Sequence, residues 1–105
     1  MARQQARQGD VLLIPVKSPT GLTEETPDGD RVVLAHGEAT GHVHAVSAAR
    51  ARAWRGADEM RYLEVRRGTQ LIHDEHFPVM LDEGWYEIRR QREYVPAALP
   101  RTVTD

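Results

Sequence analysis

Turn-forming residues interrupt this chain at short intervals, and that spacing limits the secondary structure it can form more than any other feature. Clusters containing Gly, Pro, Asp or Ser lie at 18–21, 27–30, 56–58, 67–69 and 82–84. The segments between them are short and rich in Val, Leu, Ile, Tyr and Trp, which is typical of antiparallel strands. We predict an all-β fold, a small antiparallel barrel or sandwich, with strands near 10–17, 31–36, 42–47, 51–55, 60–66, 69–74, 77–81 and 85–93.

The length of 105 residues suits a single domain. We expect a flexible N-terminal segment at 1–9, a β domain at 10–94 and a C-terminal tail at 95–105, because the two prolines near the start of that tail cannot continue a strand ladder. The strongly apolar run at 11–16 is too short to cross a bilayer or to form a secretory signal. We therefore expect a cytoplasmic protein with no membrane partner.

Cysteine is absent, which excludes disulfides, thiolate metal sites, iron–sulfur clusters and a cysteine nucleophile. Any bound metal must therefore have nitrogen and oxygen ligands. The 16 acidic residues slightly outnumber the 14 Lys and Arg residues, so the basic character of a duplex-binding protein is missing. The arginine-rich run at 89–94 is more typical of a solvated strand with cross-strand ion pairs than of a phosphate or carboxylate site. We therefore keep nucleic acid only as a less favoured alternative partner.

Four of the five histidines fall in two short motifs. The first is H-x-H, with His42 and His44, and the second is H-x-x-H, with His73 and His76. Side chains alternate along a strand, so His42 and His44 point to the same face at the separation that two ligands of one ion require. Two such motifs in so short a chain predict that these four histidines hold one metal ion.

The second motif does not define its own geometry, because residues three apart on a regular strand point to opposite faces. A bulge or turn at Asp74 and Glu75 would bring His76 to the same side as His73. Alternatively the strand stays regular, and His73 with Glu75 completes a site of three histidines and one carboxylate that His76 supports from outside. We favour the first geometry and keep Glu75 as the alternative fourth ligand.

Carboxylates near these motifs are the candidates for acid–base chemistry. Glu38 lies in the loop 37–41, which has a glycine at each end. Its carboxylate could fix the tautomer of a ligand imidazole. Glu75 is the other candidate catalytic residue, and Asp74 could support a ligand as Glu38 does. For Glu38 and Asp74, an exposed carboxylate without a role is the ordinary alternative. The fifth histidine, His36, is expected to be a surface or core residue that at most supports the site.

Imidazole and carboxylate ligands without thiolate suit Zn, Fe(II), Ni, Cu(II) or Mn, and the sequence does not distinguish these metals. Four imidazoles around a divalent ion would leave a net positive charge. Such a site would attract a small anionic ligand, or activate a water molecule if one coordination position is open.

Three stretches resemble a family of small bacterial proteins of unknown function. They are G-E-A-T-G-H-V-H at 37–44, H-D-E-H at 73–76 and Q-R-E-Y-V-P at 91–96. The resemblance covers most of residues 8–105 and implies no established activity.

More distantly, the chain is similar to the cupins, small β barrels with an H-x-H motif on a strand and ligands that typically comprise three histidines and a glutamate. No acidic residue follows His44 at the usual spacing, and no histidine follows Gly84. The resemblance therefore implies a cupin-like architecture and neither a ligand set nor a reaction.

Three classes of function fit these observations. We favour a metal-dependent binding or accessory module, because no evident general base accompanies the histidines. The second class is a small metalloenzyme, of hydrolase or oxygenase type, with an open coordination site. The third is an RNA- or protein-binding module in which the histidines are incidental. Edge strands and the proline-rich tail also predict a homodimer.

Overall fold

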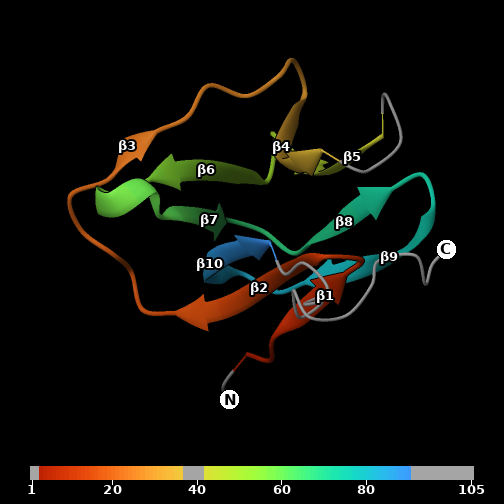
Figure 1. Ribbon diagram of the computed structural model, residues 1–105, viewed down its shortest axis with the longest axis horizontal. Coiled ribbons are helices and arrows are strands. Elements are labelled where there is room, and N and C mark those ends of the chain that lie inside the picture. The colour runs from red at the N-terminus through yellow and green to blue at the C-terminus, as the bar shows by residue number, and fades with distance from the viewer. Residues whose placement is uncertain (1–2, 37–41, 91–105) are drawn as a thin grey trace, which may run out of the picture.

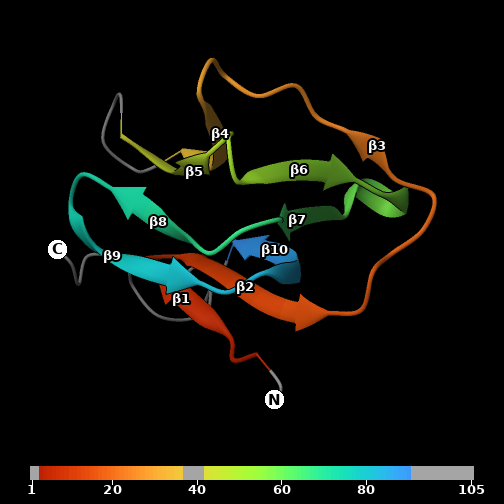
Figure 2. The same ribbon diagram turned by 180° about the vertical axis from the view of Figure 1, so that it is seen from behind.

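The computed structural model describes residues 3–36 and 42–90, which form two antiparallel β-sheets and no α-helix (Figures 1 and 2). The larger sheet has the strand order β1-β2-β10-β7-β6-β3, and the smaller has the order β4-β5-β8-β9. The elements are β1 (Ala6–Gln8), β2 (Val11–Val16), β3 (Thr23–Glu24), β4 (Arg31–His36), β5 (Val43–Ser47), β6 (Ala51–Arg55), the 3-10 helix η1 (Ala57–Glu59), β7 (Arg61–Val65), β8 (Thr69–His73), β9 (His76–Leu81) and β10 (Gly84–Arg90). The all-β prediction is confirmed, but the described strands form two separate sheets and not a closed barrel.

Apolar side chains from both sheets meet in one core. In β8, Leu71 and His73 lie on the buried face while Gln70 and Ile72 are exposed, the alternation expected of a strand with one covered face. The face that contributes Leu71 to the core therefore also turns His73 inward. The buried core residues are Val11, Leu13, Val32, Leu34, Val46, Ala51, Ala53, Leu63, Val65, Leu71, Leu81 and Tyr86. In the described ranges, no helix is long and apolar enough to cross a membrane.

The segment expected to be flexible at the N-terminus contains β1, which pairs with β2 along the edge of the larger sheet. Gln8 pairs with Val11 across the two-residue turn of Gly9 and Asp10. Gly9 has φ +60°, which fits a type II′ hairpin turn with glycine at its first central position. This short hairpin brings Gln8, which is 3% exposed, into the interior of the molecule.

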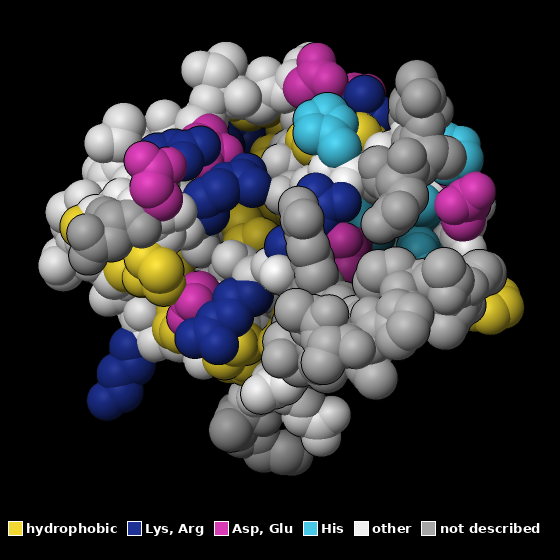
Figure 3. Space-filling model, in the orientation of Figure 1, with side chains coloured by type: hydrophobic (Ala, Val, Ile, Leu, Met, Phe, Trp, Pro, Cys, Tyr) yellow, Lys and Arg dark blue, Asp and Glu magenta, His cyan; other side chains and the backbone are white. Residues whose placement is uncertain are grey.

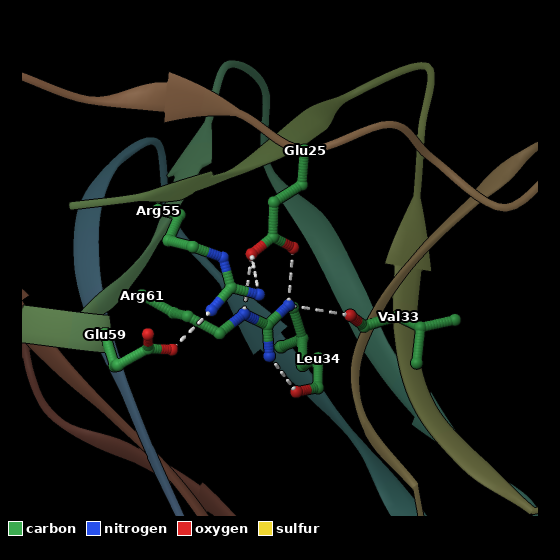
Figure 4. Close-up of polar contacts among 6 residues, drawn as sticks. All are labelled: Glu25, Val33, Leu34, Arg55, Glu59 and Arg61. Atoms are coloured by element: carbon green, nitrogen blue, oxygen red, sulfur yellow. Dashed lines mark hydrogen bonds and ion pairs between the residues drawn. The ribbon is translucent and has the colours of Figure 1, made fainter.

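Arg61 links β7 of the larger sheet to β4 of the smaller one (Figure 4). Its guanidinium pairs with both carboxylate oxygens of Glu25, at 2.9 and 2.8 Å, and donates to the carbonyls of Val33 and Leu34. The hydrogen bond from Arg61 lowers the pKa of Glu25 below its usual value, although burial acts in the opposite direction. Glu25 is therefore ionised at neutral pH, and the network stabilises the contact between the sheets.

Candidate functional site

The register of the smaller sheet brings three histidines side by side on neighbouring strands. Ala45 of β5 pairs with Ile72 of β8, which sets His44 opposite His73 in this antiparallel pair. His73 pairs in turn with His76 at the start of β9. The ring centroids of His44 and His73 are 4.3 Å apart, and those of His73 and His76 are 4.7 Å apart. Those of His44 and His76 are 5.7 Å apart, so the three rings, from β5, β8 and β9, form a compact triangle.

The fourth histidine of the two motifs contacts one member of this triangle. His42 lies just before β5, and its ring centroid is 5.8 Å from that of His73. We call His42, His44, His73 and His76 the histidine cluster. Among the described residues, His36 makes no ring contact with the cluster and is exposed at the end of β4. Histidine and acidic side chains lie close together on the right of the space-filling view (Figure 3).

The chain turns at Asp74 and Glu75, which connect β8 to β9. His73 and His76 are cross-strand partners on either side of this two-residue turn, at the right-hand end of Figure 1. The strand does not continue regularly to Glu75, as the alternative geometry required. The turn is what brings both members of the second motif to the cluster.

The carboxylates of this turn lie at the rim of the cluster. Asp74 and Glu75 have side chains 69% and 60% exposed, and each has an oxygen 3.6 Å from a ring nitrogen of His42. This separation is longer than a hydrogen bond. The other candidate carboxylate, Glu38, lies outside the described residues.

His44 is the most deeply buried member of the cluster, at 1% exposed, and its contacts fix which ring nitrogen carries the proton. The side-chain amide of Gln8 donates from Nε2 to the carbonyls of Leu71 and Phe77, both at 2.9 Å. This orientation leaves Oε1 of Gln8 at 3.0 Å from Nδ1 of His44. An amide oxygen can only accept, so Nδ1 of His44 carries the proton and Nε2 carries a lone pair. A buried imidazole held through Nδ1–H, with Nε2 unprotonated, is the usual state of a metal-ligating histidine.

Asp10 faces the unprotonated nitrogen of His44. Its Oδ1 lies 3.6 Å from Nε2 of His44, and its Oδ2 accepts a hydrogen bond from Nε of Arg90 at 2.7 Å. Burial and the charge of His73 lower the pKa of His44 to about 4, so the ring is neutral at pH 7. Burial raises the pKa of Asp10, but the hydrogen bond and charge of Arg90 outweigh it and hold that pKa below its usual value. A neutral imidazole therefore faces an ionised carboxylate.

The neutral ring of His73 has the opposite tautomer. The backbone N–H of Glu75 donates to Nδ1 of His73 at 3.0 Å, so the proton of a neutral ring is on Nε2. Within the described chain, Nε2 of His73 and Nδ1 of His42 are buried without a hydrogen-bond partner. An unpartnered buried donor or acceptor costs about 1–3 kcal/mol, and buried groups of this kind are uncommon in folded proteins. The cluster thus holds polar groups that the fold itself does not satisfy.

The same part of the chain contains no three His, Asp or Glu side chains that already form a group able to hold a metal ion. The tautomer of His73 is one chemical barrier to binding, because a ligand nitrogen must be unprotonated.

Gly9 packs directly against the cluster. A Cβ at this position would lie 2.7 Å from Nε2 of His76 and 3.3 Å from Cε1 of His44. The first distance is shorter than atoms tolerate, and φ of +60° is itself unfavourable for a residue with a Cβ. Glycine is therefore required here both by the turn and by the neighbouring rings.

Gln8 and Asp10 are site residues that the sequence analysis did not identify as candidates. A Gly-Asp pair is a signal for a two-residue hairpin turn, and recognising Gly9-Asp10 as one would have placed Gln8 in a strand. The signal is weak because Arg7 and Gln8 are polar and lack the apolar alternation of the other strands.

Comparison with known proteins gives a family but no relative of known function. No curated protein and no solved structure matches the chain. The family model that matches is described as a domain of unknown function (DUF8820), and it covers residues 7–91, including Gln8 and the histidine cluster. The chain therefore belongs to the DUF8820 family.

Proposed function

We propose that the histidine cluster binds one divalent transition metal ion and that the domain works as a metal-dependent binding or accessory module. The observation that carries this proposal is the state of His44. It is buried, neutral and held through Nδ1 by Gln8, so that Nε2 offers a lone pair beside the imidazoles of His73 and His76. A nitrogen and oxygen donor set of this kind suits Zn, Fe(II), Ni, Cu(II) or Mn.

The unsatisfied nitrogens of His42 and His73 support the same proposal. A cation would give the lone pair of a neutral His42 a partner. For His73 to bind through Nε2, its proton must move from Nε2 to Nδ1, and the hydrogen bond that Nδ1 accepts from Glu75 must break. Metal binding is thus expected to change the turn between β8 and β9, and to be weaker at acid pH, where protons compete for the imidazole nitrogens.

A binding module fits the surroundings better than the two other classes. Glu75, the candidate catalytic carboxylate within the described chain, is exposed at the rim and contacts His42 at a distance longer than a hydrogen bond. Many arginines are already paired with carboxylates, which reduces the positive charge available to nucleic acid. These paired arginines are Arg31, Arg52, Arg55, Arg61, Arg66, Arg89 and Arg90. A distant relationship to cupins is part of the proposal, since an H-x-H motif lies at the start of a strand in a two-sheet β fold.

The test is the metal content of the protein, purified without an immobilised-metal column and measured by elemental analysis. We expect about one equivalent of metal in the wild type and a loss of affinity of at least roughly tenfold in His42→Ala and His73→Ala. His36→Ala is the matched control, because this exposed histidine lies outside the cluster.

Circular dichroism and thermal melting check that each variant is folded before its metal content is compared. A wild-type protein that takes up none of the five candidate metals at micromolar concentration would contradict the proposal. Equal metal content in the wild type and both cluster variants would contradict it as well.

A further inference from the structure

The hairpin turn between β1 and β2 places two lone-pair donors against each other. Nε2 of His44 and Oδ1 of Asp10 are 3.6 Å apart. The hydrogen bond between Nδ1 of His44 and Oε1 of Gln8 fixes the proton on Nδ1, so a neutral His44 has no proton on Nε2 to share with Asp10. Two such atoms repel one another unless a cation lies between them.

The separation of these two atoms is the one that a shared metal ion requires. Zinc-to-nitrogen and zinc-to-oxygen bonds are about 2.1 Å long, so two ligands that bind one ion at an angle of about 110° lie roughly 3.4 Å apart. The observed 3.6 Å differs from this value by little, and it is too long for a direct hydrogen bond.

Arg90 holds the other oxygen of Asp10. Its Nε donates to Oδ2 at 2.7 Å, and its Nη2 donates to the backbone carbonyl of His36. The carboxylate is therefore fixed with Oδ2 on the guanidinium and Oδ1 directed at His44. Each oxygen of Asp10 has a separate contact.

We propose that Asp10 is a ligand of the metal ion, bound through Oδ1 beside Nε2 of His44, and that Arg90 is the positioning residue for this carboxylate. The proposal rests on the proposed metal-binding function, and it makes Asp10 the carboxylate ligand in place of Glu75. Asp10 is only 26% exposed in its side chain, whereas Glu75 is 60% exposed and faces His42, whose two nitrogens are both near carboxylates. The first turn of the chain thereby becomes one wall of the site.

A carboxylate in the ligand set changes the metals that the site prefers. It reduces the net charge of a divalent site by one and adds a hard oxygen donor to the imidazoles. This favours Mn and Fe(II) more than a site of imidazoles alone would.

The experiment compares Asp10→Asn with Arg90→Gln and with the control Asp28→Asn in the full-length protein. Zinc affinity is measured by competition with a chromophoric chelator, and the ligand set is read from the absorption spectrum of the Co(II)-substituted protein. We expect Asp10→Asn to lower zinc affinity by roughly 100-fold and to shift the Co(II) bands, because an amide oxygen is a poorer ligand than a carboxylate. Arg90→Gln should lower affinity by about tenfold and keep the wild-type Co(II) bands, as expected when a partner of a ligand is lost. Asp28→Asn, which also removes a carboxylate paired with an arginine but lies outside the histidine cluster, should change neither quantity.

The two variants separate a ligand from a structural ion pair, since both break the contact between Asp10 and Arg90. If Asp10→Asn has the zinc affinity and Co(II) spectrum of the wild type, Asp10 is not a ligand, while the histidine site stands. If Asp10→Asn and Arg90→Gln lose affinity equally and neither shifts the Co(II) bands, the ion pair alone is responsible and the inference is overturned. A wild-type protein that takes up none of the candidate metals at micromolar concentration instead refutes the proposed function itself, so the two failures are distinguishable.

Discussion

Replacing Gln8 by leucine tests the central argument about the site, because its amide connects β1 to three other strands. Gln8 donates to Leu71 and Phe77 and accepts from His44. Leucine has a similar size but makes none of these contacts. Three hydrogen bonds at about 1 kcal/mol each give an expected loss of about 3 kcal/mol in the free energy of unfolding. For a domain of this size that loss lowers Tm by roughly 12 to 24 °C.

The measurement is urea unfolding of the metal-free protein, with Gln70→Leu as the matched control. Gln70 is exposed on β8, so the same substitution there should change the free energy of unfolding by less than about 0.5 kcal/mol. Nitrogen-15 NMR of the histidine rings reports the tautomer directly. We expect His44 in the Nδ1–H form in the wild type, and loss of that preference together with a 10- to 100-fold weaker metal affinity in Gln8→Leu.

Two outcomes would refute this reasoning. An Nε2–H tautomer for His44 in the wild type would mean that the amide of Gln8 does not orient the ring. A loss of less than about 1 kcal/mol in Gln8→Leu would mean that the three buried bonds do not hold β1 to the sheets as argued.

Two further predictions concern the same site. Gly9→Ala should cost about 1–2 kcal/mol through its positive φ and should also weaken metal binding by displacing His76. Gly29→Ala is the control, because Gly29 has φ +64° and no neighbouring atom within 4 Å. It should be destabilised by the backbone strain alone in urea unfolding, and its zinc affinity should be unchanged. Equal zinc affinity in the two variants would contradict the contact between Gly9 and His76. Folding lowers the pKa of His44 from 6.5 to about 4. As the pH falls through this range, the unfolded chain therefore binds a proton before the folded protein does. The free energy of unfolding of the metal-free protein should fall by up to about 3 kcal/mol over the same range. NMR titration of the ring checks this, and a pKa near 6.5 in the folded protein would contradict it.

The strands with apolar alternation could be predicted from the sequence. Segments such as 31–36, 51–55 and 69–74 match β4, β6 and β8 closely, because their side chains repeat with the period of two that a half-buried strand requires. β1 and the two-residue β3 could not be predicted in this way. They are short and polar, and pairing with β2 and β6 is what makes them strands.

The sequence by itself determined that the fold is all-β. This follows from local periodicity, which depends only on neighbours along the chain. Tertiary structure decided the site. Only the turn at 74–75 brings His73 and His76 together, and only the register of β5 on β8 sets the two motifs side by side. Only the pairing of β1 with β2 brings Gln8 to His44. A contact between residues 36 apart depends on how the strands pair, and it produces no periodic pattern in the sequence.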